Sequence, residues 1–213
     1  MFQSIKLFII VFINFLFISC AFGTRMVNLE NPISFPETNT QKTSKSTKIK
    51  FDGFINKREQ VSSSWFEIKS DKYDLIGHVR NTYYMPTANV YSYEDAVNWI
   101  NKSVKNKILN SGYEIIENSK IKSGRNSSSD ISIEGNVLLV YADSYFNFDG
   151  RVSIEIIFKR LNTGEVLLRK VYEEVNTSYH LAKTPEGFKE VLEGSLKSII
   201  YSMFMDLENL DSK

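Results

Sequence analysis

Residues 151–172 read RVSIEIIFKRLNTGEVLLRKVY. Apolar side chains recur at every second position from Val152 to Phe158, which is the period of a strand with one buried face. Asn162-Thr163-Gly164 then has the composition of a tight turn, and a second strand is expected at 166–175. This hairpin places an antiparallel sheet in the C-terminal half of the chain.

Further strands are expected on the N-terminal side of this hairpin, because short runs of apolar residues alternate with polar ones. They lie at 48–52, 65–68, 75–79, 113–116 and 131–141. Between them we expect a loop from Asn81 through Pro86 to Ser92, and a polar loop at 120–130 that is rich in serine and glycine.

Two amphipathic helices are also indicated. Ser92 followed by Asp95 resembles a capping box at the start of the first helix, and Gly112 fits its left-handed end. For the second helix, Thr184 is a candidate N-cap and Pro185 suits the first helical position. Apolar residues recur at helical spacing at 97, 100, 104 and 108, and at 188, 192, 196, 199, 203 and 207.

These elements predict an α+β fold with a largely antiparallel sheet and two amphipathic helices packed on one face. The long apolar stripe of the second helix has an alternative interpretation as a membrane or partner surface. Packing against the sheet is the simpler interpretation, because a helix must bury such a stripe somewhere.

The first nineteen residues have the composition of a signal peptide, with Lys6 near the start of an apolar run that ends at Ile18 and the small residue Ser19 after it. Cys20 follows directly and is the only cysteine, so it cannot form an internal disulfide. The segment resembles a bacterial lipobox, although Phe17 stands where leucine is usual. The resemblance implies cleavage before Cys20 and acylation, for example with palmitate. An ordinary secretory signal cleaved after Ala21 or Gly23 is the alternative.

Acyl chains on Cys20 would hold the mature protein on a membrane without a spanning helix. We therefore expect a location in the cell envelope, anchored to the inner or outer membrane of a diderm bacterium. Residues 20–47 are rich in Asn, Thr, Ser and Lys without a sustained period, and are expected to form a flexible tether with an end-to-end distance of roughly 30 Å. Residues 48–213 then form a single domain.

Composition and motifs argue against several classes of function. The formal net charge is +1, and cleavage before Cys20 removes Lys6 and no acidic residue, so the mature chain is balanced. A chain with balanced charge lacks the excess of basic residues that is typical of a nucleic-acid binder. No spacing resembles a metal site or a phosphate loop, so no metal and no cofactor are expected. His78 and His180 have no nearby catalytic companions, and structural roles are expected for both.

One segment has the residue types of a protein contact surface, because tyrosine and arginine are enriched in interfaces. The candidate partner-binding residues are Arg80, Asn81, Tyr83, Tyr84, Tyr91 and Tyr93. The alternative is that this segment covers an edge of the sheet. A second aromatic cluster has the same two interpretations, either core packing or a hairpin tip that contacts lipid or protein; it contains Tyr141, Tyr145, Phe146 and Phe148.

The order of several motifs resembles the YajG-type uncharacterised bacterial lipoproteins over residues 66–207. The resemblance is carried by IGHVRN at 76–81, TANV at 87–90, the helix that contains Trp99, SGYEI at 111–115, the strand at 152–159, Gly164 and the helix at 188–207. That family is similar in layout to auxiliary lipoproteins of ABC-type transport systems. The resemblance implies an anchored α+β domain and no assigned chemistry.

The leading hypothesis is a noncatalytic lipoprotein that binds or scaffolds an envelope component, in transport or lipid trafficking. The main alternative is a surface-exposed lipoprotein that binds a host or environmental ligand. A third hypothesis is a secreted hydrolase whose site is assembled from distant residues.

Overall fold

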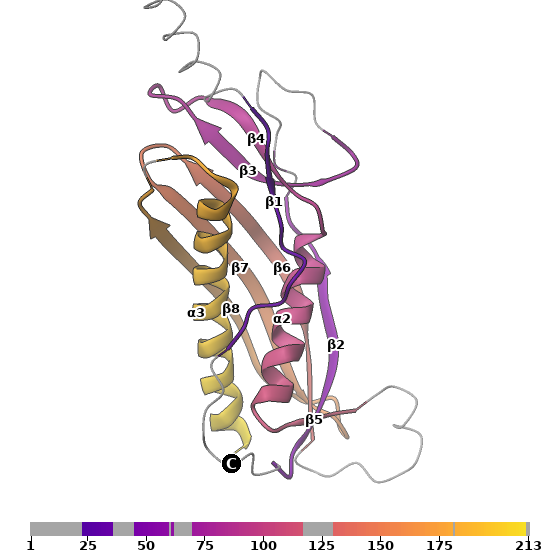
Figure 1. The fold of residues 1–213 in the computed structure, drawn as a ribbon. Helices are drawn as coiled ribbons and strands as arrows, with labels where there is room; N and C mark the ends of the chain where they lie inside the picture. Colours follow the sequence, from indigo (N-terminus) through magenta and orange to yellow (C-terminus); the bar gives the residue numbers. More distant parts are fainter. Residues whose placement is uncertain are drawn as a thin grey trace, which may run out of the picture.

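A computed structural model describes residues 23–35, 45–59, 61, 70–116, 130–180 and 182–211. This part of the chain forms one eight-stranded sheet and two long helices (Figure 1). The strands are β1 (Arg25–Val27), β2 (Lys48–Asn56), β3 (Asp74–Arg80), β4 (Pro86–Ser92), β5 (Glu114–Ile115), β6 (Ile131–Ser144), β7 (Phe148–Arg160) and β8 (Val166–Ser178). The helices are α2 (Ala96–Asn110) and α3 (Pro185–Asp211).

The long strand β6 organises the sheet. One edge of β6 pairs with β7 in antiparallel fashion along its whole length, and β7 pairs with β8 in the same way. Along its other edge, β6 carries two parallel partners end to end. Residues 131–137 pair with β2, and residues 142–144 pair with β3. A glycine is required at this second contact, because a Cβ on Gly77 would lie 1.6 Å from the carbonyl oxygen of Ala142.

The sheet is therefore mixed, and the expectation of a largely antiparallel sheet holds only in part. The predicted hairpin β7–β8 and the hairpins β6–β7 and β3–β4 are antiparallel, whereas β1–β4, β2–β5, β2–β6 and β3–β6 are parallel. Side-chain alternation identifies strands and their buried faces, but it does not say which strands far apart in sequence become neighbours.

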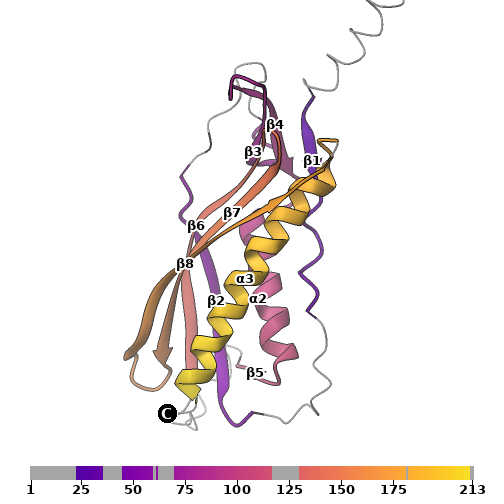
Figure 2. The ribbon, with the colours of Figure 1, turned by 90° about the vertical axis from the view of Figure 1, so that its left-hand side faces the viewer.

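Both helices lie on the same side of the sheet, and the core fills the space between (Figure 2). The predicted apolar stripes of α2 and α3 are buried throughout. The stripe of α3 is thus part of the core and not a membrane or partner surface. Helix α3 lies close to β7, as shown by the hydrogen bond that Ser195 Oγ donates to the carbonyl of Gly150 at 2.8 Å.

The helix ends follow the predicted signals with one shift. Asp95, rather than Ser92, is the N-cap of α2, since its carboxylate accepts hydrogen bonds from the backbone N–H groups of Val97 and Asn98. Gly112 has a φ of 83°, as expected for a glycine just past a helix end. Pro185 is the first residue of α3.

The segment expected to be a loop from Asn81 to Ser92 contains strand β4. Residues 87–92 of this strand are all buried, including Thr87, Asn89 and Ser92. A strand buried on both faces shows no alternation, so its pattern carries no period-two signal. Pro86 is tolerated because it is the first residue of the strand.

Part of the stretch expected to be a flexible tether, residues 23–35, is folded onto the domain. Arg25–Val27 form β1 beside β4, and the apolar side chains that follow are buried in the core: Val27, Leu29, Ile33 and Phe35. Ile33 bonds through its backbone to Ser103 and Asn106 of α2, and the ring of Phe35 packs edge-on against Tyr201 of α3. Residues 23–35 therefore belong to the domain. Their apolar residues have no regular spacing because the segment from 28 to 35 is neither helix nor strand.

Several expectations fall on residues outside the described part: the signal peptide, Cys20, the strand at 65–68, and most of the loop at 120–130. Within the described part, no helix combines the length and the apolar composition needed to cross a membrane.

Candidate functional site

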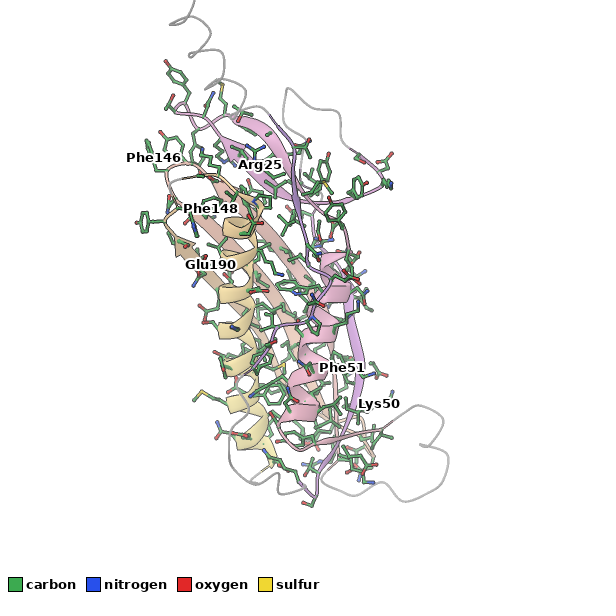
Figure 3. All side chains as sticks on the ribbon, viewed as in Figure 1. Arg25, Lys50, Phe51, Phe146, Phe148 and Glu190 are labelled. Carbon is green, nitrogen blue, oxygen red and sulfur yellow. The ribbon has the colours of Figure 1, made fainter. Side chains whose placement is uncertain are left out.

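Exposed aromatic side chains gather at one end of the sheet, where the β3–β4 and β6–β7 turns and the β8–α3 connection meet. We define the aromatic tip as Tyr83, Tyr84, Met85, Phe146 and Tyr179. Tyr179 is 82% exposed, Tyr83 81% and Phe146 74%, and these are the three most exposed large apolar residues of the described chain. Figure 3 shows Phe146 and Arg25 at this same end of the molecule.

Tyr145 joins the two hairpin turns that form the tip. Its hydroxyl donates to the carbonyl of Thr82 at 2.8 Å, and its ring meets that of Tyr84 edge-on with centroids 5.5 Å apart. The ring of Phe146 lies against Tyr145 at 4.1 Å. Residues that are about sixty positions apart in sequence thus form one surface.

The β3–β4 turn is held by its own side chains. Asn81 Oδ1 accepts hydrogen bonds from the backbone N–H groups of Tyr83 and Met85, both at 3.0 Å. Tyr84 has a φ of 63°, a left-handed conformation that costs energy for a residue with a Cβ. The Asn81 contacts offset that cost and fix Tyr83 and Tyr84 in projecting positions.

Beneath the tip, Arg80 and Asp143 form an ion pair that is largely removed from solvent. Arg80 Nε donates to Asp143 Oδ2 at 2.6 Å, and the guanidinium also donates to Tyr141 Oη and to the carbonyl of Tyr84. Burial disfavours the charge of Arg80, but Asp143 and Tyr141 outweigh it and raise the pKa of Arg80. Burial also raises the pKa of the Tyr141 hydroxyl. Arg80 therefore supports the tip from below.

Lys183 connects the β8–α3 segment to both hairpins. Its ammonium donates to the carbonyls of Arg80 at 2.9 Å and Ser144 at 3.2 Å, each directly before a turn. Burial lowers the pKa of Lys183, with Asp143 acting in the opposite direction. The carbonyl of Lys183 in turn accepts from Arg25 Nε at 3.0 Å, which brings the start of β1 to the base of the tip.

The remaining predicted contact residues lie elsewhere. Tyr91 is only 3% exposed, and its hydroxyl accepts hydrogen bonds from the backbone N–H of Ser70 and from Asn89 Nδ2. Tyr93 is exposed and packs against Tyr73, but it lies past the far end of β4, about 20 Å from the turn. Of the six predicted residues, the structure brings together Arg80, Asn81, Tyr83 and Tyr84.

The second predicted aromatic cluster is split: two of its residues pack in or near the core, and two lie at the exposed hairpin tip. Phe148 is buried in the core beside Phe188 of α3, and Tyr141 is half-buried against Arg80 and His78. Tyr145 and Phe146 belong to the turn at the tip. Tyr179 is not among the residues predicted from the sequence, and strand register is the signal that locates it. Phe148 pairs with Ser178, so the residue after β8 must lie level with the β6–β7 turn.

Both histidines have polar partners. His78 is buried, with its Nδ1 3.1 Å from Tyr141 Oη. His180 Nε2 lies 2.9 Å from Glu190 Oε2 and 3.0 Å from Ser178 Oγ. In a catalytic triad, the acid and the nucleophile contact different nitrogens of the imidazole. Here one nitrogen faces both, so Ser178, His180 and Glu190 do not have triad geometry.

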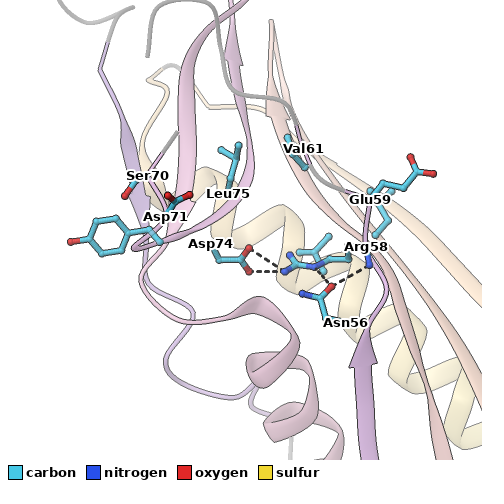
Figure 4. A pocket seen from close by; sticks show the side chains of 11 residues that line it. Asn56, Arg58, Glu59, Val61, Ser70, Asp71, Asp74 and Leu75 are labelled. Carbon is cyan, nitrogen blue, oxygen red and sulfur yellow. Dashed lines mark hydrogen bonds and ion pairs between the residues drawn. The ribbon is translucent and has the colours of Figure 1, made fainter. Parts of the chain in front are cut away.

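A pocket of about 260 Å³ lies beside the start of β3 (Figure 4). Two of its charged side chains are paired with each other, because Arg58 donates to both carboxylate oxygens of Asp74 at 3.0 and 3.1 Å. Asp74 also accepts from the backbone N–H of Ala96 at the start of α2. Through these contacts, Asp74 on β3 connects the segment after β2 with the start of α2. Among the described residues, no group of three or more His, Cys, Asp or Glu side chains is arranged to hold a metal ion.

Comparison with known proteins identifies the fold. The sequence matches no family model and no curated protein. Protein XCC0632 from Xanthomonas campestris, whose structure is described with the family model DUF330, has a TM-score of 0.56 and 10% identity over 88% of this chain and 98% of that chain. At that identity the likeness shows the fold alone.

Two other solved structures share less of the geometry. An uncharacterized protein has a TM-score of 0.44 and 8% identity over 89% of this chain and 98% of that chain. A candidate lipoprotein from Caulobacter crescentus CB15 has a TM-score of 0.39 and 11% identity over 54% of this chain and 82% of that chain. None of these three structures bears the name YajG.

Proposed function

We propose that this chain is a lipid-anchored protein of the cell envelope whose domain binds or scaffolds an envelope component and does not catalyse a reaction. The observation that carries the proposal is the position of Cys20. It directly follows the apolar run of a signal peptide and precedes the first described residue of the folded domain, Gly23, by three positions. A cysteine directly after such a run is suited to acylation.

The polar contacts of the domain support a noncatalytic role. The most shielded ion pairs of the described residues join separate parts of the fold: Arg80 on β3 with Asp143 on β6, and Arg58 just after β2 with Asp74 on β3. The Ser178, His180 and Glu190 cluster lacks the geometry of a triad. What the domain presents outward is the aromatic tip, and rigid exposed tyrosines are typical of binding surfaces. Tyr83 and Tyr84 are the predicted contact residues that the proposal retains as direct contacts.

The resemblance of the sequence to YajG-type lipoproteins, and of their layout to transport auxiliary lipoproteins, leads us to propose a role in envelope transport or lipid trafficking. The shared fold with a DUF330 protein is compatible with this family relationship. Anchoring would keep the domain at the membrane where such an assembly works.

Anchoring is tested in the native host with wild type, Cys20→Ser and the control Ser19→Ala. We expect the wild type and the control to partition into detergent, and mass spectrometry to find acyl chains on the N-terminal peptide that begins at Cys20. Cys20→Ser should be released or remain as an uncleaved precursor. An unmodified Cys20 in the mature protein would contradict the proposal.

A surface-exposed lipoprotein that binds a host or environmental ligand is the second candidate function. The exposure of the tip aromatics favours it, since aromatic rings also form ligand platforms. Protease added to intact cells distinguishes the two. An envelope-internal domain is protected until the outer membrane is opened, whereas a surface domain is cleaved at once.

A further inference from the structure

We propose that the aromatic tip rests in the interfacial layer of the same membrane leaflet that holds the acyl chains of Cys20. The domain would then contact the bilayer at two points, through the acyl chains and through Tyr83, Phe146 and Tyr179. This inference rests on the proposed lipid anchoring and names the membrane lipid as the occupant of the tip.

The length of chain between the anchor and the fold is the first argument. Only two residues, Ala21 and Phe22, lie between Cys20 and Gly23, and an extended chain spans at most about 3.5 Å per residue. The Cα atom of Gly23 must therefore lie within about 10 Å of the Cα atom of the acylated Cys20. The folding of residues 23–35 onto the domain removes the long tether that would otherwise let the domain move away.

The position of Gly23 relative to the tip is the second argument. The Arg25 guanidinium bonds to the carbonyl of Gly23 and, through Nε, to the carbonyl of Lys183. Lys183 bonds to Arg80 and Ser144, the residues directly before the two turns. The start of the fold is thus connected through two side chains to the base of the tip, and the anchor and the tip must face the same membrane.

The chemistry of the tip is the third argument. Tyrosine is enriched where membranes meet water, because its ring is apolar and its hydroxyl remains hydrated. Tyr83 and Tyr179 provide that chemistry, while Phe146 and Met85 provide exposed apolar area at the same end. Other exposed apolar residues, such as Val166 and Met205, lie along the strands and helices away from this end. A cluster of this kind marks an interaction site rather than ordinary surface.

The tip is also built before any membrane binds. Asn81 fixes one turn, Tyr145 joins it to the other, and Arg80 with Asp143 supports both from beneath. A rigid surface loses little conformational entropy when it binds. Burial of even a modest apolar area in the membrane interface therefore gives a favourable free energy of binding.

The experiment uses the fact that Cys20 is the only cysteine, so that acylation leaves the wild-type chain without a free thiol. We introduce Phe146→Cys at the tip and, as a matched control, Val166→Cys beside the β7–β8 turn at the opposite end of the sheet. The lipidated proteins carry a nitroxide label on the new thiol. They are reconstituted at low density in vesicles of phosphatidylcholine and phosphatidylglycerol, and collisions with oxygen and with a water-soluble nickel chelate are measured.

We expect the label at position 146 to collide more with oxygen and less with nickel than the label at position 166. In a second variant with Tyr83→Asp, Phe146→Asp and a label at Tyr179→Cys, nickel access should rise relative to Tyr179→Cys alone. Equal accessibilities at positions 146 and 166 overturn the proposal.

Other occupants give different results. A second copy on the tip would shield position 146 from both reagents and broaden its spectrum by contact between labels, and that outcome also overturns the lipid proposal. Labelling of the wild-type chain would show that Cys20 is not acylated, which overturns the anchoring and this inference together. A blocked Cys20 with equal accessibilities overturns the tip contact alone.

Discussion

Arg80 on β3 and Asp143 on β6 hold the two hairpins of the aromatic tip together, with Arg80 Nε 2.6 Å from Asp143 Oδ2. The two side chains are 18% and 8% exposed. Their strands lie side by side in the parallel ladder that pairs His78 with Asp143. The pair therefore fixes the position of turns that are far apart in the sequence.

Arg80→Ala should lower the free energy of unfolding by about 3 kcal/mol, because it leaves the Asp143 carboxylate buried without its cation. The measurement is urea unfolding followed by far-UV circular dichroism. Arg160→Ala is the matched control, since its pair with Glu165 is exposed and should contribute less than about 1 kcal/mol. Similar losses in the two variants would show that the buried pair has no special role.

Gly150→Ala should destabilise the protein by about 1–3 kcal/mol, the usual cost of overpacking. The new Cβ would lie 2.5 Å from the backbone carbon of Val191, so α3 would have to move away from β7. Gly194→Ala is the control, because its Cβ would meet only the end of the Asn176 side chain and alanine favours the helix. We expect its thermal midpoint to stay near that of wild type, and a large loss there would contradict this account of the interface.

Leu29→Ala should cost about 2–4 kcal/mol, because Leu29 is fully buried in the core although it lies before the first long strand. Ser34→Ala, at an exposed position in the same segment, should leave the urea midpoint unchanged. If Leu29→Ala were also neutral, residues 23–35 would be a dispensable tether after all.

Stability in acid should depend on Asp206. The hydrogen bond from Lys170 is the main cause that lowers the pKa of Asp206, with Tyr172 contributing a second bond and burial opposing both. A lowered pKa in the folded state means that the unfolded chain binds the proton more tightly. This contribution is present above the unfolded pKa of about 3.9 and is lost as the pH falls through the folded value.

Urea midpoints measured between pH 2 and pH 6 check this expectation. Asp206→Asn should flatten the acid end of the profile, whereas Glu173→Gln, an exposed carboxylate on β8, should leave its shape as in wild type. An unchanged profile for Asp206→Asn would remove Asp206 from the acid response.

The sequence was sufficient for the elements with a regular period. The hairpin at Asn162-Thr163-Gly164, the apolar stripes of α2 and α3, and the strands β2, β3, β6 and β7 are confirmed. The stripes of the helices leave a repeating pattern in the sequence, because each helix buries one face. Strand β3 was recognised from its apolar run, although Leu75 to Val79 are all buried.

The elements that were not predicted bury their side chains in ways that leave no regular period in the sequence. Strand β4 is buried on both faces, and the segment after β1 is buried without being regular. The parallel pairings with β6 join distant residues, which periodicity does not specify. At the candidate site, composition identified Tyr83, Tyr84 and Phe146, but burial of Tyr91 and the ion pair of Arg80 depend on the tertiary structure alone.

The end-to-end arrangement of β2 and β3 along β6 sets the height of the molecule. Fourteen residues of β6 extend about 45 Å from the tip to the opposite end. With the tip on the bilayer, the β7–β8 turn at Gly164 would stand at that distance from the headgroups. A partner that approaches from the aqueous phase would meet this distal end first, and one embedded in the same membrane would meet the hairpin turns.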